Sequence, residues 1–342
     1  MPVDVQLITM ASLTSKSAPG YRLRVQGLTA AMETMGLELE ISDLSIGPMR
    51  SIEILSYISY KNCSKLKDIL SKFGGEVVFF GLQPAALLCL FPTRKVKGMQ
   101  ITVDVCDSWL RLSEIGSKKN GIKSRLKLIL VRTVYRMLER RVQNFSYISN
   151  RDLVDDSRYL TNTDNSEVVP NGIPDWCVGR YFAEAGNPKQ LLFVGSGSYP
   201  PNQQALRNAV KLLGEQLAAD EVRLRVVGEG WKLSEHPSID HIGWIDDLAS
   251  EYENAGATLT LLDSGAGVSN KVIESLAVGR PVLASSQIYD QFNHIPGVHL
   301  ADEVTLGKLL EKLANSTLET PSKNWDFPSW LDSARKLLKY ER

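Results

Sequence analysis

The residues most able to do chemistry stand in the stretch GAGVSNKVIESLAVGRPVLAS, residues 265–285. Gly265 and Gly267 let the backbone approach a ligand closely, and the first N–H groups of the helix that follows favour a phosphate. Lys271 lies in the first turn of that helix, where a cation is unfavourable unless an anion is bound nearby. Glu274 lies on the same face, where a carboxylate can accept hydrogen bonds from ribose hydroxyls. The residues alone leave one alternative open, a solvated surface pair.

A second polar group follows a predicted strand in the first half of the chain. Asp104 and Asp107 stand in ITVDVCDSW, at the end of a β-branched run. Polar side chains at the carboxyl end of a parallel strand lie where ligands bind. Asp107 is the candidate for a functional role, and the alternative is an aspartate that caps the segment after it.

The elements that position these residues alternate along the chain. Short β-branched runs are followed by amphipathic segments of helical length, which predicts α/β structure with parallel sheets. The predicted strands are VQLIT, LELEIS, EVVFFG, MQITVDV and FSYIS in the first half, and QLLFVG, VRLRVVG, ATLTLLD, PVLAS and GVHLA in the second. A helix capped by Ser269 or Asn270 and ended by Gly279 lies between the predicted strands ATLTLLD and PVLAS.

Breaks in the pattern divide the chain. The segment PNGIP cannot continue a helix or a central strand, so we place a hinge near 172–188. This predicts an N-terminal domain over 1–172, a C-terminal domain over 173–325, and a last helix over 326–342 that packs back on the first domain. Two doubly wound domains that face each other form a cleft, and ligands bind at the carboxyl ends of their strands.

Composition excludes several classes of protein. The four cysteines are scattered and no paired Cys or His spacing is present, so we expect reduced thiols and no metal site. The chain shows no secretory signal and no long apolar run, which favours a cytoplasmic protein. All four histidines lie after residue 235, so the first domain offers no histidine as a general base.

Charge is distributed unevenly although the net charge is zero. Residues 1–172 carry about +6 and the remainder about −6, which favours an anionic partner for the first half. Residues 118–141 hold nine Lys or Arg and one acidic residue, with apolar residues at helical spacing. Such a helix can lie on an anionic membrane surface, can steer an anionic acceptor, or can be an ordinary solvated face. The acidic second half argues against nucleic acid.

The stretch 265–285 resembles the donor-site signature of retaining glycosyltransferases with the GT-B fold, the family 4 group of bacterial sugar transferases. LLFVGSGSYPPNQQAL, LRVVGEG, IDHIGWIDDLASEYENAGATLTLL and VVPNGIP are similar to other parts of the same pattern, in the same order. The resemblance is strong over 165–290 and present only in outline before residue 100. It implies two Rossmann-like domains, a nucleotide-sugar donor bound mainly by the second domain, and no metal or other cofactor.

The resemblance also implies roles for individual residues. Glu274 corresponds to the glutamate that holds the donor ribose, and Asp107 lies near a functional polar residue of the first domain. The residues implied around the sugar and diphosphate are Gly265, Gly267, Val268, Ser269, Asn270 and Lys271. Those implied along the base are Glu229, Gly230 and Ile245. The loop implied to face the first domain contains Gly195, Ser196, Gly197 and Asn202. Pro19, Gly20 and Arg24 stand where the first glycine-rich loop of the family approaches the phosphates.

The chain departs from the family at two points. The glutamate that often contacts the transferred sugar is replaced by Ala266, and the loop after LLFVG lacks the usual basic residues. We expect Lys271 and a first-domain arginine to supply that charge. A catalytically inactive nucleotide-sugar-binding protein is therefore an alternative. A Rossmann oxidoreductase is a weaker one, because Pro200 stands where its third glycine belongs.

These observations predict an enzyme that transfers a hexose from a UDP- or GDP-linked donor to a glycan or lipid-linked acceptor with retention. Asp107, Lys271 and Glu274 are the predicted catalytic residues. The predicted location is the cytoplasm, at the inner face of the plasma membrane through 118–141, in the biosynthesis of a polysaccharide.

Overall fold

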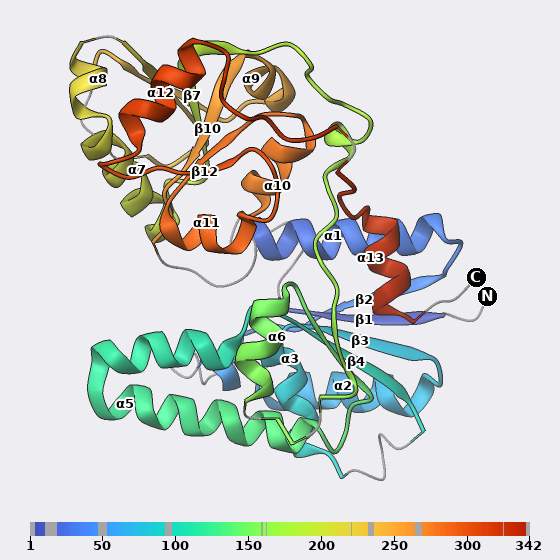
Figure 1. Ribbon diagram of the computed structural model, residues 1–342. Helices are drawn as coiled ribbons and strands as arrows, with labels where there is room; N and C mark the ends of the chain where they lie inside the picture. Colours follow the sequence, from blue (N-terminus) through green and yellow to red (C-terminus); the bar gives the residue numbers. More distant parts are fainter. Residues whose placement is uncertain are drawn as a thin grey trace. The chain divides into compact units, whose positions relative to one another are not determined.

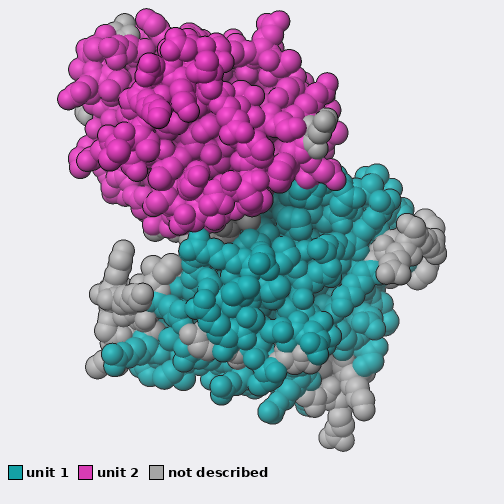
Figure 2. Space-filling view, viewed as in Figure 1, with its two compact units in different colours: residues 1–172, 266–268, 328–342 teal, residues 173–265, 269–327 magenta. Residues whose placement is uncertain are grey.

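The structure is a computed structural model. It describes residues 4–10, 19–46, 53–92, 98–158, 160–161, 163–219, 221–231, 236–263, 269–323 and 325–339, without the side chains of 19, 53, 112 and 115–124. The chain divides into two compact units, coloured teal and magenta in Figure 2. The first unit holds the described residues up to 172 and those from 328 onward, and the second holds the described residues 173–327.

The described residues of the first unit form one parallel sheet in the order β2-β1-β3-β4-β5-β6 (Figure 1). Its strands are β1 (Val5–Thr9), β2 (Leu39–Asp43), β3 (Glu76–Phe80), β4 (Gln100–Cys106), β5 (Asn144–Tyr147) and β6 (Ser166–Val168). The helices are α1 (Pro19–Thr34), α2 (Tyr60–Lys72), α3 (Leu82–Ala85), α5 (Trp109–Leu138), α6 (Asn150–Ser157) and α13 (Trp330–Leu337), with the 3-10 turns η1 (Glu53–Leu55) and η2 (Ala86–Leu90).

Strand β3 shows why the central strands of this sheet are continuous apolar runs in the sequence. Val77 and Phe79 pack into the cluster that covers one face of the sheet, and Val78 and Phe80 pack into the cluster on the other face. Because helices cover both faces, every side chain of the strand's interior is buried, as parallel sheets require.

The C-terminal helix α13 belongs to the first unit and packs against α1. The Trp330 ring lies so close to Gly27 that a Cβ at this glycine would stand 2.3 Å from the ring. Ser329 and Asp332 form a capping box at the start of the helix, and Ser333 donates a hydrogen bond of 2.8 Å to the carbonyl of Pro170. The last helix therefore completes the core of the unit in which the chain begins.

The described residues of the second unit also form a parallel sheet, in the order β12-β11-β10-β7-β8-β9. Its strands are β7 (Asn187–Val194), β8 (Arg223–Val227), β9 (Ile239–Gly243), β10 (Ala255–Thr260), β11 (Val282–Ala284) and β12 (Val298–Leu300). The helices are α7 (Pro200–Leu212), α8 (Gly214–Ala218), α9 (Leu248–Asn254), α10 (Asn270–Ala277), α11 (Ser286–Phe292) and α12 (Leu306–Ala314), preceded by η3 (Asp175–Cys177). The strand order reverses between β7 and β10, so the carboxyl ends of these two strands flank a switch point.

The predicted α/β fold with two doubly wound parallel sheets is confirmed. Each strand predicted from the alternating runs is present, with bounds shifted by a few residues. The alternating runs did not include β6 (Ser166–Val168), which is too short to show a period, or β9 (Ile239–Gly243), which was indicated only by the resemblance of IDHIG to the family pattern. No helix in the described part of the chain is long and apolar enough to cross a membrane.

Candidate functional site

Two glycine turns meet at the carboxyl ends of β7 and β8. The Gly197 N–H donates to the carbonyl of Glu229 over 2.8 Å. A Cβ at Gly197 would lie 2.5 Å from the backbone of Gly230, and one at Gly228 would lie 1.9 Å from the carbonyl oxygen of Gly195. The turns therefore pack backbone against backbone, which only glycine allows at these positions.

The first turn of α7 joins these glycine turns to α10. Asn202 is 7% exposed, and its Nδ2 donates to the carbonyl of Ser196 over 3.0 Å. Its Oδ1 accepts a 3.0 Å hydrogen bond from Lys271 Nζ, which also lies 5.0 Å from the centre of the Phe193 ring. A Cβ at Gly195 would stand 3.1 Å from the same Nζ. The structure thus brings Gly195, Asn202 and Lys271 together at the switch point.

Glu274 lies one turn further along α10 and is 9% exposed. Its Oε2 accepts a 3.0 Å hydrogen bond from the hydroxyl of Tyr252 in α9. Burial raises the pKa of Glu274, against the Tyr252 hydrogen bond and the charge of Lys271. Burial also lowers the pKa of Lys271 to about 8, although the Glu274 charge opposes this. Both charges are therefore incompletely compensated by the protein.

The start of α10 offers further polar groups. Ser269 is the N-cap, but its side chain makes no capping hydrogen bond, and Oγ is buried without a partner among the described residues. Asn270 and Lys271 follow in the first turn, and the Val272 N–H after them donates to the carbonyl of Ser269 over 3.0 Å. Gly265, Ala266, Gly267 and Val268, which the sequence analysis placed here, lie outside the described residues.

The arrangement can bind an anion next to a hydroxyl-bearing group. A cation at a helix start that has no ion pair with a carboxylate among the described residues favours a phosphate. A buried carboxylate on the same helix face accepts hydroxyl donors, and such charge-assisted hydrogen bonds are strong in low dielectric.

The residues predicted to line a base lie in and after the turn that follows β8. Glu229 and Gly230 are exposed, and Ile245 packs beside Leu248 in the cluster under β8. Sequence reasoning missed Trp231, which follows this turn and packs edge-on against Phe193 with 5.6 Å between ring centres. Its Nε1 is buried and has no partner among the described residues. Sequence reasoning also missed Tyr252, because nothing in EYENAG distinguishes a buried tyrosine from a surface one.

The first-unit candidates have different environments. Arg24 is 1% exposed, and its guanidinium donates to both carboxylate oxygens of Asp104, over 2.7 and 2.8 Å. It also donates to Asn171 Oδ1 and to the carbonyl of Val169. In this structure Arg24 therefore closes the core of its own unit rather than presenting charge to solvent. Gly20 is exposed in the first turn of α1, and nothing described lies within 4 Å of its Cβ position.

Asp107 follows β4, at the carboxyl edge of the first sheet. It is not the N-cap of α5, because the Ser108 hydroxyl accepts from the Arg111 N–H in that role. Burial and the neighbouring Asp152 charge raise the pKa of Asp107 to about 6, against the charge of Arg24. Cys106, just before it, has a positive φ of 61°, a strained conformation that turns the chain sharply here.

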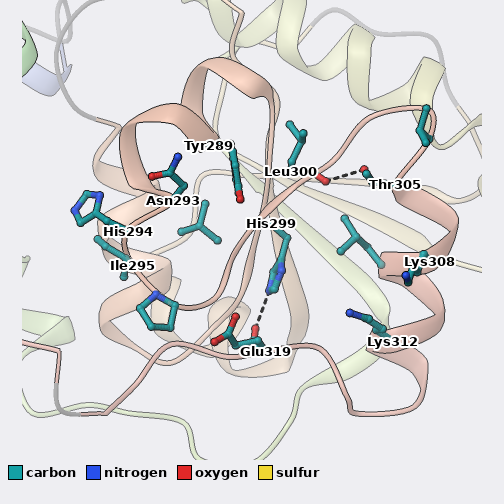
Figure 3. Close-up of a pocket in the computed structure, with 14 residues that line it drawn as sticks. Tyr289, Asn293, His294, Ile295, His299, Leu300, Thr305, Lys308, Lys312 and Glu319 are labelled. Atoms are coloured by element: carbon teal, nitrogen blue, oxygen red, sulfur yellow. Dashed lines mark hydrogen bonds between the residues drawn. The ribbon is translucent and has the colours of Figure 1, made fainter.

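A separate hollow of about 640 Å³ lies at the β12 edge of the second sheet (Figure 3). Lys308 and Lys312 line it from α12, and His294 lines it from the end of α11. The His299 ring is joined to the carbonyl of Glu319 by a hydrogen bond of 2.8 Å. No residue of the predicted site lines this hollow, so it is distinct from the centre around Lys271.

Comparisons with known proteins bear on both units. Residues 188–314 match the family model "Glycosyl transferases group 1". Sucrose-phosphate synthase from Thermosynechococcus elongatus is 14% identical with a TM-score of 0.66, over 98% of this chain and 94% of that one. HepE from Anabaena, solved in complex with UDP, is 9% identical with a TM-score of 0.61, over 98% and 95% of the two chains. The search of curated proteins found no match.

A third similar structure, the UDP-GlcNAc 2-epimerase from Methanocaldococcus jannaschii, is 12% identical with a TM-score of 0.55, over 98% of this chain and 99% of that one. At such identities these structures show the fold, the GT-B arrangement of two Rossmann-like domains, which hosts more than one activity. The family match favours a glycosyltransferase over an epimerase. It covers Asn202, Lys271 and Glu274.

Proposed function

We propose that the chain transfers a hexose from a UDP- or GDP-linked donor to a glycan or lipid-linked acceptor, with retention of the anomeric configuration. The observation that carries the proposal is the convergence of Lys271, Asn202 and Glu274 at the switch point of the second unit. The segment that matches the group 1 glycosyl transferases contains all three. The UDP complex of HepE is a precedent for a uridine nucleotide on this fold.

The donor is held by the second unit in this proposal. The turns 195–197 and 228–230, which their glycines allow to pack backbone against backbone, lie against the base and diphosphate in this proposal. The diphosphate lies beside the ammonium group of Lys271 and the first turn of α10. The ribose hydroxyls donate to Glu274. Lys271 and Glu274 thus have distinct chemical tasks in this proposal.

The transfer step breaks the bond between the anomeric carbon and the diphosphate oxygen, which keeps the electron pair. The acceptor hydroxyl oxygen forms the new bond on the same face and loses its proton to the departing oxygen. Lys271 stabilises the negative charge that develops on the leaving group, which accelerates the reaction when the stabilisation is greater than in the ground state. No resident metal ion takes part in this proposal.

The acceptor is bound by the first unit in this proposal. Asp107 stands at the carboxyl edge of its sheet, where it can orient an acceptor hydroxyl. The described side chains of α5 include a stripe of exposed Arg125, Ile129 and Arg136, with Leu126 61% exposed beside it. Basic and apolar side chains on one exposed face suit an anionic lipid surface. We therefore place the protein in the cytoplasm at the inner face of the plasma membrane, a contact that co-sedimentation with anionic and neutral vesicles checks.

Glu274→Ala tests the donor site. We expect the dissociation constant for UDP or GDP, whichever the wild-type chain binds, to rise about 100-fold, because two hydrogen bonds from ribose hydroxyls to a charged group are lost. Isothermal titration calorimetry measures the constant, and circular dichroism checks that the fold is retained. Glu253→Ala, which removes an exposed carboxylate from α9 in the same unit, is the matched control.

Three outcomes separate the alternatives. Wild-type affinity in Glu274→Ala contradicts the assigned site. A wild-type chain that binds neither UDP nor GDP contradicts the donor class. A chain that binds a nucleotide-sugar but neither hydrolyses nor transfers it is the inactive binding protein that Ala266 raises as the second candidate.

A further inference from the structure

The side chain of Tyr252 contacts Glu274, and its hydroxyl has a fixed position. The residue is 0% exposed, and its hydroxyl lies 3.0 Å from Glu274 Oε2 and 3.4 Å from the carbonyl oxygen of Lys271. A phenol has a single proton to donate. The Glu274 carboxylate is both the nearer and the stronger acceptor, so the Tyr252 proton is donated to it. Tyr252 thus joins α9 to the two residues of α10 that the donor site uses.

Both ends of Tyr252 are held in place. Its ring lies 5.3 Å from the centre of the Trp176 ring and packs in a cluster with Leu192 and Val278. Its backbone carbonyl accepts a 2.9 Å hydrogen bond from the Nε of Arg280, which is 3% exposed. The hydroxyl therefore cannot move away from Glu274 without disturbing packed residues.

This contact divides the carboxylate of Glu274 into two unlike halves. Oε2 accepts from Tyr252, whereas Oε1 has no hydrogen-bond donor within the described part of the chain. A side chain whose last torsion is broad would otherwise sample many carboxylate orientations. With one oxygen held, the other is presented in a defined direction.

We propose that Tyr252 is a positioning residue, which holds Oε2 of Glu274 so that Oε1 meets the two ribose hydroxyls of the donor. The inference rests on the proposed function, since it assigns Glu274 to the ribose. Tyr252 itself does not touch the donor. Its effect on donor binding is therefore transmitted entirely through the Glu274 carboxylate.

Tyr252→Phe tests this role, because it removes the hydroxyl and keeps the ring and its packing. With UDP and GDP as probes in calorimetry, we expect the tighter nucleotide to bind about tenfold more weakly, as for the loss of one hydrogen bond to a charged group. In the Glu274→Ala background the same change should have no further effect, because Tyr252 acts through Glu274. Tyr181→Phe is the matched control: it removes a hydroxyl that donates to Pro321 in the same unit, and it should leave affinity unchanged.

The pH dependence of nucleotide affinity tests the positioning role separately, because a loss of packing alone would not change it. Burial raises the pKa of Glu274 and the Tyr252 hydrogen bond lowers it, so Tyr252→Phe should raise this pKa further. The loss of nucleotide affinity on acidification should then begin at a higher pH in the variant. If Tyr252→Phe lowers nucleotide affinity equally at every pH, and affinity starts to fall on acidification at the same pH as in the wild type, the positioning role is contradicted.

The outcomes distinguish this inference from the proposed function. If Glu274→Ala weakens binding and Tyr252→Phe does not, the inference alone fails. If neither change weakens binding, the donor site itself is wrong. Should the phenylalanine variant not fold, a crystal structure of the wild-type chain with UDP decides: the ribose on Oε1 with Tyr252 still on Oε2 supports the inference, and a carboxylate turned away from Tyr252 overturns it.

Discussion

Each unit contains a cation near a buried carboxylate, Arg24 fully buried in the first unit and Lys271 partly buried in the second, and the two pairs differ in how completely the protein satisfies them. In the first unit, Arg24 donates to both oxygens of Asp104, and Asp104 also accepts from the hydroxyl of Ser146 over 2.7 Å. Burial alone would lower the pKa of Arg24, but the adjacent Asp104 charge outweighs it and the pKa is raised. This pair is complete without any ligand.

In the second unit, Lys271 and Glu274 each have a neutral hydrogen-bond partner instead of one another. Lys271 donates to the Asn202 amide oxygen, and Glu274 accepts from the Tyr252 hydroxyl. Burial shifts the pKa of each toward its neutral form. Charges that the fold leaves undercompensated cost stability, which is typical of sites that bind a ligand. The difference teaches that the fold itself satisfies the Arg24–Asp104 pair, whereas Lys271 and Glu274 keep charge that the proposed donor would compensate.

The largest expected effect comes from breaking the complete pair. Asp104→Asn leaves the buried Arg24 guanidinium without its countercharge, so we expect the first unit to lose about 3–5 kcal/mol of unfolding free energy. Glu274→Gln, a substitution of similar shape in the second unit, should change stability by less than about 1 kcal/mol, because a costly buried charge is removed. Urea denaturation of both variants measures this. Equal losses of unfolding free energy in the two variants would show that the two pairs do not differ in how the protein satisfies them.

The sequence singled out Lys271 and Glu274 together but gave no sign that Arg24 pairs with Asp104, for a physical reason. Lys271 and Glu274 are three residues apart on one helix, and Asn202 joins them because parallel strands bring the turns that follow them to one edge. Arg24 and Asp104 are separated by much of the first unit, and no local pattern shows that α1 turns the arginine inward. A buried arginine and one that meets a phosphate look alike in sequence.

The same reasoning holds for the elements. The apolar strands β1 and β3 show their alternation with helices plainly, whereas β9, with the polar residues Asp240 and His241, does not. Trp330 is different: its contact with Gly27 depends on a helix returning to a unit that the chain left long before. Sequence reasoning could state that the last helix is amphipathic and propose where it docks, but the glycine that receives it carried no signal.

A second prediction compares a glycine of each unit, Gly197 in the second and Gly20 in the first. Gly197→Ala would put a Cβ 2.5 Å from the backbone of Gly230, so the two turns must separate. We expect a loss of about 1–3 kcal/mol in stability of the second unit and weaker nucleotide binding. Gly20→Ala in the first unit meets nothing within 4 Å and should be neutral or stabilising by up to about 1 kcal/mol, since alanine favours a helix.

Thermal unfolding measures the stability of both glycine variants, and titration with UDP or GDP measures their nucleotide affinity. A Gly197→Ala chain as stable as the wild type would show that the turns are not packed as closely as described. A strong loss of nucleotide affinity in Gly20→Ala, with the fold intact, would show instead that the first unit's loop approaches the donor.

The smallest expected effect is the pH dependence of donor affinity, and it separates the two cations directly. With a pKa of about 8, Lys271 is protonated at pH 7 and largely neutral at pH 9 in the free protein. A bound diphosphate favours the protonated form, so affinity should fall as the pH rises through 8, by up to about tenfold per pH unit. Arg24, whose pKa is raised, contributes nothing to this fall. Calorimetry of UDP or GDP between pH 7 and 9 measures it, and Lys271→Met should flatten the dependence. If the methionine variant keeps the same slope, another group carries the titration, and Lys271 is as fully compensated by the protein as Arg24 is.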